Sequence, residues 1–290
     1  MQKLSSSQRD AVCHGEGPCA VIAGPGSGKT TVIVERISHL IRFRGVEPSS
    51  ILVMTFSRAA ALEMRNRFLQ GLQRDFCSPE SDTSADVVFG TFHSVFFRIL
   101  QESSETRLTM VPRAGKERYL RHLCEVRPEY TLTPKMDVNG KDQLRKVRLP
   151  DGMTTEKLQL LISRCKNGLS CSEPWLPPLV REYDRYLNSR SWLDFDDMIL
   201  RCRDCLRERP EILEKWRSRF HWILVDEFQD ISPSQYSALL ILSAPRGNLF
   251  VVGDDDQSIY GFRGADPHTM RRFLSDCGLV KANLPRVRFF

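Results

Sequence analysis

A glycine-rich stretch near the N-terminus carries the clearest chemistry in the sequence. Residues 23–30 read "AGPGSGKT" and fit the pattern (Ala or Gly)-x4-Gly-Lys-(Ser or Thr) of a phosphate-binding loop, or P-loop. Glycines tolerate positive φ and close backbone approach, so successive N–H groups can face phosphate oxygens. Lys29 would reach the β- and γ-phosphates of a nucleotide, and Thr30 would bind Mg²⁺. The alternative is a flexible turn without a ligand. The loop and the residue that follows it comprise Ala23, Gly24, Pro25, Gly26, Ser27, Gly28, Lys29, Thr30 and Thr31.

A pair of acidic residues supplies the second half of a nucleotide site. The run "ILVDEFQD" at 223–230 is an apolar strand that ends in Asp226 and Glu227. Carboxylates at the carboxyl end of a parallel strand lie where α/β proteins bind ligands. Asp226 would hold Mg²⁺ through water, and Glu227 would orient and deprotonate an attacking water molecule. The competing interpretation is that the two acidic residues only keep the end of the strand soluble.

A second acidic run raises a question that the residue types alone leave open. Residues 251–265 read "VVGDDDQSIYGFRGA", with three consecutive aspartates after an apolar run. Such a stretch can hold a metal, contact a substrate or cap a strand. An independent metal site built on the aspartates is one alternative. Contact of Asp254 with the magnesium region, with Asp255 and Asp256 as caps or loop ligands, is the other.

The elements that must position these residues follow from hydrophobic patterning. Five short apolar runs predict buried strands, and most are followed by a helical pattern such as "KTTVIVERISHLI". Strands that alternate with helices predict βαβ units and an α/β fold with a doubly wound parallel sheet. The runs are "CAVIA" at 19–23, "ILVMT" at 51–55, "DVVFGT" at 86–91, "WILVD" at 222–226 and "LFVVG" at 249–253.

The middle of the chain interrupts this alternation. From 106 to 190 we find no convincing strand, only helical stretches such as "GKERYLRHLCEV" punctuated by prolines. The sequence therefore predicts an all-helical subdomain at 106–190, inserted into an α/β domain formed by 1–105 and 191–290. The insert also carries most of the excess charge, with 17 Lys and Arg against 10 Asp and Glu, in a chain of net charge +6. The charge fits either a solvated helical surface or a contact with a polyanion.

Composition bounds the class of protein. The 290 residues contain 41% hydrophobic and 27% charged residues, no apolar run of transmembrane length and no signal-peptide pattern at the N-terminus. The nine cysteines, without a secretory signal, indicate reduced thiols and an intracellular location, nuclear in a eukaryote and cytoplasmic or nucleoid in a bacterium. Cys202 and Cys205 form one CxxC pair. Because no second pair matches it, packing is favoured over metal binding.

Taken together, the motifs resemble those of superfamily 1 DNA helicases of the UvrD, Rep and PcrA group. The P-loop, "VDEFQD" and "VGDDDQSIYGFRGAD" occur in the order of that family. "LSSSQRDAV" resembles its Q motif, "MTFSRAAALEM" the motif after the second strand, and "GTFHS" the motif after the third. "DFDDMI" at 194–199 resembles the stretch that returns from the inserted helices. The seven ordered matches cover nearly the whole chain and imply a RecA-like P-loop domain.

The resemblance implies an ATP site with Mg²⁺. Gln8 reads the edge of adenine, Gln257 senses the γ-phosphate, and Thr30 and Asp226 hold the metal. Thr31 stands where some members place an arginine that stacks on adenine, so that contact is expected to be missing. The residues implied to take part in catalysis are Lys29, Asp226, Glu227 and Gln257.

The resemblance also implies contacts with single-stranded DNA and with junctions between single strand and duplex. Aromatic stacking grips any base, at about 1–3 kcal/mol per base. Phe56 and Phe262 are implied to stack, although Phe262 stands where close relatives usually carry Trp. Arg58 stands where Lys is common and keeps the cation. A lone Phe after a strand is otherwise a core residue. The implied DNA contacts are Phe56, Arg58, Thr91, Phe92, His93, Tyr260, Phe262 and Arg263.

Family members are much longer and carry a second RecA-like domain that supplies arginine fingers, and this sequence does not include such a domain. Arginine fingers contribute about 10³–10⁵ in rate in related phosphoryl transfer. We therefore predict the ATP-binding N-terminal part of an ATP-dependent 3′→5′ DNA helicase or translocase. The alternative is a nucleotide- and DNA-binding module with little or no ATPase activity of its own. A P-loop kinase or GTPase, the third possibility, predicts no affinity for oligonucleotides.

Overall fold

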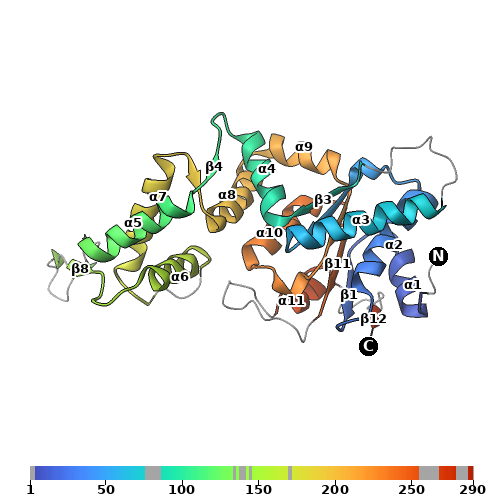
Figure 1. The fold of residues 1–290 in the computed structure, drawn as a ribbon, viewed down its shortest axis with the longest axis horizontal. Helices are drawn as coiled ribbons and strands as arrows, with labels where there is room; N and C mark the ends of the chain where they lie inside the picture. The colour runs from blue at the N-terminus through green and yellow to red at the C-terminus, as the bar shows by residue number, and fades with distance from the viewer. Residues whose placement is uncertain are drawn as a thin grey trace. The chain divides into compact units, whose positions relative to one another are not determined.

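A computed structural model describes residues 4–75, 86–132, 135–136, 142–143, 146–168, 172–254, 268–278 and 287–289. The chain divides into two compact units (Figure 1). Unit 1 comprises Met1–Glu102 together with Cys202–Phe290, and unit 2 comprises Ser103–Arg201. No helix in the described ranges is long and apolar enough to span a membrane.

Unit 1 is built on a six-stranded sheet in which all neighbouring strands run parallel. The strand order is β12-β1-β11-β10-β2-β3, so the chain crosses two strand positions between β1 and β2 and later fills the gap with β10 and β11. This crossover brings residues 200 positions apart in sequence to the same edge of the sheet. The strands are β1 (Cys19–Ala23), β2 (Ile51–Thr55), β3 (Val88–Thr91), β10 (Trp222–Val225), β11 (Leu249–Gly253) and β12 (Val287–Phe289).

The predicted parallel α/β sheet is confirmed. All five apolar runs form strands, and β1, β2 and β11 begin and end at the predicted residues. Strand β3 starts at Val88, two residues later than expected, and β10 ends at Val225, before the acidic pair. Every residue of β2 and β11 is buried, because helices cover both faces of a doubly wound sheet.

Helices cover the two faces of the sheet. Helices α1 (Ser6–Cys13), α2 (Lys29–Arg44) and α3 (Arg58–Asp75) share one buried cluster with the strands. Figure 1 shows α10 (Pro233–Ser243) and α11 (Thr269–Asp276) on the opposite side of the sheet from α1 and α2. On that side the ring of Phe228 makes edge contacts with Tyr236 and Phe273. The remaining helices of the described chain in this unit are α4 (Phe92–Ser103), α9 (Pro210–Arg219) and the end of α8 (Phe195–Glu208).

Unit 2 departs from the all-helical prediction. Helices α5 (Arg113–Val126), α6 (Thr155–Lys166) and α7 (Leu176–Asn188) do form its core. However, short strands pair in three places: β4 (Thr109–Met110) with β9 (Trp192–Leu193), β5 (Glu129–Thr131) with β8 (Lys146–Arg148), and β6 (Lys135–Met136) with β7 (Asp142–Gln143). Strands of two or three residues have no periodicity that could be read from sequence, and β4 and β9 pair across about 80 positions.

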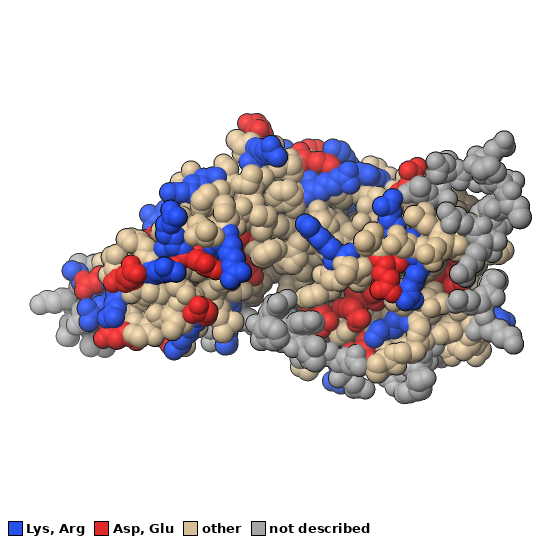
Figure 2. All heavy atoms as spheres, in the orientation of Figure 1, with Lys and Arg blue, Asp and Glu red and all other residues tan. Residues whose placement is uncertain are grey.

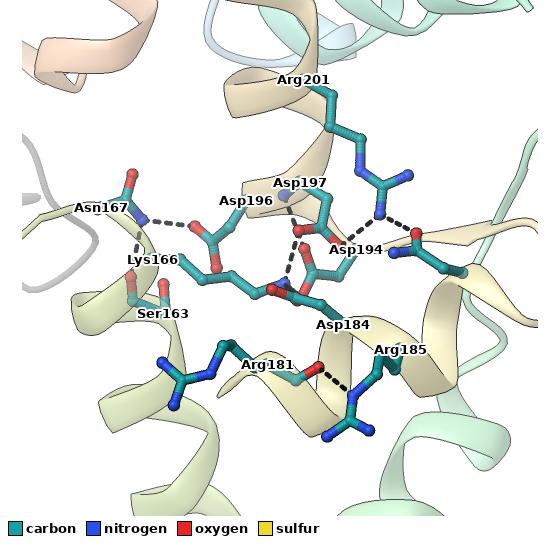
Figure 3. Close-up of polar contacts among 11 residues, drawn as sticks. Ser163, Lys166, Asn167, Arg181, Asp184, Arg185, Asp194, Asp196, Asp197 and Arg201 are labelled. Carbon is teal, nitrogen blue, oxygen red and sulfur yellow. Dashed lines mark hydrogen bonds and ion pairs between the residues drawn. The ribbon is translucent and has the colours of Figure 1, made fainter. Parts of the chain in front are cut away.

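A buried ion cluster joins the helices of unit 2 (Figure 3). The Nζ of Lys166, at the end of α6, lies 2.7 Å from Asp184 on α7, 3.1 Å from Asp194 and 2.6 Å from Asp197 on α8. Asp194 also accepts a hydrogen bond from the Asp197 amide at 2.8 Å and so caps α8. Burial opposes the charged lysine, yet the three carboxylates hold the pKa of Lys166 above its usual range. Each charge in the cluster thus has a partner.

Candidate nucleotide and nucleic-acid site

The order of the strands arranges the candidate residues in one line along the carboxyl edge of the sheet. The P-loop follows β1, Asp254 follows β11, Asp226 follows β10, Phe56 follows β2 and Phe92 follows β3. Since β1, β11, β10, β2 and β3 are successive neighbours, the phosphate-binding motif lies at one end of this line and the aromatic motif at the other. Neighbouring strands are about 4.8 Å apart, so β1 and β10 are separated by roughly 10 Å.

The P-loop has the backbone geometry that its glycines predict. Gly26 has φ +70° and Gly28 has φ +91°, a left-handed conformation that residues with a Cβ rarely adopt, whereas Gly24 lies outside this region. Gly28 precedes α2, and the hydroxyl of Ser27 donates to the Gly24 carbonyl at 2.6 Å. The loop therefore closes on itself directly before a helix N-terminus, where unpaired N–H groups and the helix dipole favour an anion.

Lys29 reaches past the one strand, β11, that lies between β1 and the strand before the acidic pair, β10. Its Nζ lies 3.9 Å from Glu227 Oε2, and its side chain is only 13% exposed. Glu227 has φ +50° and ψ +47°, a left-handed conformation that is uncommon for a residue with a side chain. Strain of this kind costs about 1–3 kcal/mol and concentrates at functional sites. The P-loop lysine and the predicted catalytic glutamate are thus brought together by the fold.

Asp226 and Asp230 lie beside this pair in an environment that disfavours charge. Asp226 is 5% exposed, and burial, followed by the charge of Glu227, raises its pKa to about 6. Burial and Glu227 likewise raise the pKa of Asp230 to about 6. The Oδ1 atom of Asp226 is buried without a hydrogen-bond partner among the residues that the structure describes. An ionised carboxylate in such a place needs a cation, and Lys29 acts on it only weakly.

Gln8 is held against the P-loop. Its Oε1 accepts from the Ser5 amide at 2.9 Å within a capping box of α1, and its Nε2 donates to the Ser27 carbonyl at 2.8 Å. A Cβ on Gly28 would lie 3.0 Å from this Nε2, so a larger residue there would displace Gln8. A primary amide has two N–H donors and two acceptor lone pairs, so one of each remains for a further ligand.

At the β2 end of the line, Phe56 is half-buried and Arg58 is exposed. The Ser57 hydroxyl accepts from the Ala60 amide at 3.1 Å and caps the start of α3, and Thr55 donates to the Ser57 carbonyl at 2.9 Å. These local bonds hold the turn that carries Phe56 and Arg58 beyond the sheet edge.

The stretch after β3 only partly matches its predicted role. Phe92 is 1% exposed and packs against Phe96, with ring centroids 6.1 Å apart, so its prediction as a DNA contact is wrong: a base cannot reach a side chain in the core. Thr91 is 8% exposed, and its Oγ1 accepts from the Ser94 amide at 3.1 Å, where it caps α4. His93 is half-buried, and burial lowers its pKa. The imidazole is therefore neutral near pH 7 and suits a hydrogen bond rather than an ion pair.

Four predicted residues, Gln257, Tyr260, Phe262 and Arg263, lie outside the described residues, as do Asp255 and Asp256. Asp254, directly before them, is 4% exposed, and its amide donates to Gln229 Oε1 at 3.0 Å. Of the CxxC pair, Cys202 is buried and Cys205 is half-buried. Within the described ranges no group of three or more His, Cys, Asp or Glu is arranged to hold a metal.

The sequence analysis missed two residues of the site, Gln229 and Asp230. Both belong to the short turn η3 (Phe228–Asp230), which folds back directly after Glu227. The signal was present in "DEFQD", since two further polar residues follow the acidic pair within three positions. Their role depends on the left-handed turn at Glu227, and that turn could not be predicted from the residue types.

Unit 2 contains a separate cavity of about 580 Å³ between α5, α6 and the start of α8. Its lining includes Arg113, Lys116 and Arg121 together with Phe195, whose surface is 63% exposed. Figure 2 shows Lys and Arg side chains spread over this part of the molecule, with Asp and Glu interspersed. The same lining carries Glu117, Glu156 and Asp194, so its three cations are matched by three carboxylates.

Comparison with known proteins decides the family. The family model described as the UvrD/REP helicase N-terminal domain matches residues 4–278. The chain belongs to this family. Its parallel sheet with a P-loop after β1 is the RecA-like fold of such helicase domains.

The relatives are bacterial proteins. A putative ATP-dependent DNA helicase, YjcD of Bacillus subtilis, is 35% identical over 289 residues, which cover 94% of this chain and 34% of that protein. The ATP-dependent DNA helicase PcrA of Staphylococcus aureus is 31% identical over 95% of this chain and 36% of its own length. The ATP-dependent DNA helicase Rep of Buchnera aphidicola is 32% identical over 94% and 39%. The chain thus spans about a third of the length of these relatives.

Proposed function

We propose that this chain is the ATP- and DNA-binding N-terminal part of an ATP-dependent 3′→5′ DNA helicase or translocase. The observation that carries the proposal is the 3.9 Å approach of Lys29, which follows β1, to Glu227, which follows β10, past the intervening β11. The fold thus brings a P-loop lysine and a strand-end glutamate to the same place, as a site that binds phosphate and orients water requires. The names of the relatives, all ATP-dependent DNA helicases, support the same activity.

The residues present fit a magnesium ion. The Asp226 carboxylate is buried, and its Oδ1 lacks a hydrogen-bond partner within the described chain, as a ligand awaiting a hard cation would. We assign the metal to Asp226 and to the hydroxyl of Thr30, at the start of α2. When bound, Mg²⁺ supplies positive charge that neutralises the phosphate oxygens.

The chain's own residues then have distinct roles. The N–H groups of Gly26, Gly28 and the first turn of α2 bind the phosphates, and Lys29 neutralises their charge. Glu227 orients a water molecule and accepts its proton. The spare N–H donor and acceptor lone pair of Gln8 match the N7 acceptor and N6 donor of adenine, the pairing that glutamine makes with this base elsewhere.

For nucleic acid, we propose that a single strand runs along the far end of the same sheet edge. Phe56 supplies a ring for stacking, Arg58 a cation for phosphate, and Thr91 and His93 hydrogen bonds to the sugar-phosphate backbone. Gln257, Tyr260, Phe262 and Arg263 remain part of this proposal. Duplex DNA at a junction is assigned to the cations of α5 in unit 2.

The test is hydrolysis of ATP by this chain with and without a single-stranded oligonucleotide. The proposal expects turnover that requires Mg²⁺, rises with the oligonucleotide, and disappears in Lys29→Ala and in Glu227→Gln. Glu227→Gln should still bind the nucleotide, because it keeps the shape of the side chain and removes only the base. Turnover that persists in both variants would show a contaminating ATPase and remove the assignment.

The alternative is a module that binds nucleotide and DNA with little turnover. It predicts affinity for both ligands and a hydrolysis rate near that of Glu227→Gln. Binding to neither ligand would contradict both proposals and leave only the fold.

A further inference from the structure

Gln229 occupies a position between two strand ends at the proposed ATP site. It lies in the turn η3 directly after the left-handed Glu227, and it is 4% exposed. The turn packs against both β11 and α11. A fully polar side chain buried at this point costs free energy unless its amide is hydrogen-bonded. The hydrogen-bond partners of Gln229 therefore indicate its role.

The amide of Gln229 both donates and accepts a hydrogen bond at the ends of β10 and β11. Its Nε2 donates to Glu227 Oε2 at 2.7 Å, and its Oε1 accepts from the backbone amide of Asp254 at 3.0 Å. The Asp254 amide can only donate and the ionised Glu227 carboxylate can only accept, so the orientation of the amide is determined. Glutamate or methionine at this position could not make both bonds.

The end of β11 is shaped to admit this side chain. A Cβ on Gly253 would lie 2.7 Å from Gln229 Oε1 and 3.3 Å from its backbone nitrogen, with Met270 Cε at 3.0 Å on the other side. Contacts below 3.0 Å are essentially never found for real Cβ atoms. A methyl group on Gly253 would therefore push the end of the Gln229 side chain aside, and the cause is proximity, since the φ of Gly253 is not in the left-handed range.

Glu227 needs such a partner. Its backbone is in the left-handed conformation and its side chain is 38% exposed, so packing alone does not fix the carboxylate. Oε2 has two partners, Gln229 at 2.7 Å and Lys29 at 3.9 Å. Only the contact with Gln229 is at hydrogen-bond distance, and Lys29 is expected to turn toward phosphate when a nucleotide binds. Gln229 then remains as the group that holds Glu227.

We propose that Gln229 is a positioning residue for the hydrolysis step, which fixes the Glu227 carboxylate and ties it to the backbone at the end of β11. This proposal rests on the proposed function, because it assumes that Glu227 accepts the proton of the attacking water. The contacts of Gln229 are with Glu227 and Asp254, so we expect it to act on the rate of hydrolysis and to leave nucleotide affinity nearly unchanged.

The experiment is single-turnover hydrolysis of labelled ATP with this chain in excess, which measures even a slow reaction. Each variant gives a maximal rate constant and a protein concentration at half-maximal rate. Gln229→Glu keeps the acceptor for the Asp254 amide but turns a second acceptor toward Glu227, and Gln229→Met removes both bonds at similar volume. We expect the maximal rate to fall about 10- to 100-fold in both, with half-saturation within about 3-fold.

Gln235 provides the matched control. It is also 4% exposed, and its Oε1 accepts from the Ser232 amide at 2.7 Å in a capping box that glutamate fills equally well. Gln235→Glu should therefore keep the wild-type rate. If Gln229→Glu retains the wild-type maximal rate, or loses affinity in the same proportion as rate, the positioning role is wrong. A wild-type rate no faster than that of Glu227→Gln contradicts the proposed function itself, and the role of Gln229 with it.

Gly253→Ala tests the same contact from its other side. The added methyl group displaces the Gln229 amide, so this variant should lose rate without losing affinity. In the double variant with Gln229→Met, Gly253→Ala should lower the maximal rate by less than about a further 2-fold, because the contact is already gone. Full multiplication of the two losses would show that Gly253 and Gln229 act independently and would overturn the proposed link.

Discussion

Two lysines in this protein contact carboxylates, and they differ in burial and in the number of those contacts. Lys166, in unit 2, is 3% exposed and contacts three aspartates at 2.6–3.1 Å. Lys29, in unit 1, is 13% exposed and contacts one glutamate at 3.9 Å. Buried carboxylate oxygens without a hydrogen-bond partner among the described residues occur in both places, on Asp184 and Asp197 as well as on Asp226, so the difference lies in the cation contacts. The first cluster is closed and the second is open.

The difference separates a structural ion cluster from a binding site. Buried charges are tolerated when geometry and hydrogen bonds compensate for the loss of water. Around Lys166 the protein supplies that compensation itself, with carboxylates from α7 and α8. Burial raises the pKa of Asp226 to about 6, and it does the same for Asp197 in the closed cluster, so the pKa values do not distinguish the two sites. The cation contacts do, because Lys29 lies 3.9 Å from Glu227 whereas Lys166 lies within 3.1 Å of three aspartates. The open cluster is stabilised only when a cation and an anion enter it.

The largest expected effect is on the closed cluster. Lys166→Met leaves Asp184, Asp194 and Asp197 without their cation, and breaking a buried ion cluster in this way costs about 3–5 kcal/mol. Lys29→Met should cost less than about 1 kcal/mol, since its single contact is long and partly exposed. Urea unfolding monitored by circular dichroism measures both. Equal losses for the two variants would remove the distinction between the clusters.

A smaller effect is expected at Asp226, and it depends on pH. Because the folded pKa is about 6 against an ordinary value of 3.8, the folded state binds the proton more tightly. Its contribution to stability is therefore present below pH 4 and is lost as pH rises through about 6. Asp226→Asn should raise the melting temperature at pH 7.5 by a few degrees and leave it nearly unchanged at pH 4.

Asp226→Asn should also weaken binding of Mg²⁺ with nucleotide. That loss would show that the buried carboxylate binds the metal and is not only a destabilising charge. Thermal melts in the absence and presence of Mg²⁺ and nucleotide give both quantities. Destabilisation by Asp226→Asn at pH 7.5 without ligand would mean that the carboxylate already has its partner within the protein.

The smallest effect per residue is expected on duplex binding, from changes to cations that belong to neither cluster. Arg113 is almost fully exposed and, among the described residues, pairs with Glu117, a contact that contributes little to stability. Reversing Arg113, Lys116, Arg118 and Arg121 to glutamate should leave folding intact and lower the salt slope of duplex binding by about 0.9 per lost phosphate contact. Reversal of Arg209 and Lys215 is compared with reversal of Arg113 and Lys116 alone, which changes the net charge by the same amount. An unchanged slope in the α5 variants would make α5 an ordinary solvated surface.

Local patterns predicted much of unit 1. The apolar runs that form β1, β2 and β11 are flanked by polar or glycine-rich segments, so even their ends were correct. The P-loop glycines Gly26 and Gly28 adopt the conformation that their type permits. These features depend on residues close together in the sequence, and local sequence patterns predict such features well.

Contacts between distant residues could not be predicted in the same way. Lys166 meets Asp194 and Asp197 about 30 positions away, and Gln229 meets Asp254 after 25. Phe92 was predicted as a DNA contact because it belongs to the "TFHS" stretch that resembles the family motif, but as the first residue of the amphipathic α4 it is buried in the core. Which side of an element faces the core is decided by packing and not by the motif that contains the residue.

The central claim is that nucleotide completes the ionic site around Lys29. The direct measurement is the affinity of Mg²⁺ and a non-hydrolysable ATP analogue for the wild type, Lys29→Met and the control Lys215→Met, which removes an exposed lysine paired with Glu102. We predict a loss of about 10- to 100-fold for Lys29→Met, since a charged hydrogen bond contributes about 1.5–3 kcal/mol, and no change for the control. Equal affinities for all three proteins would contradict the account.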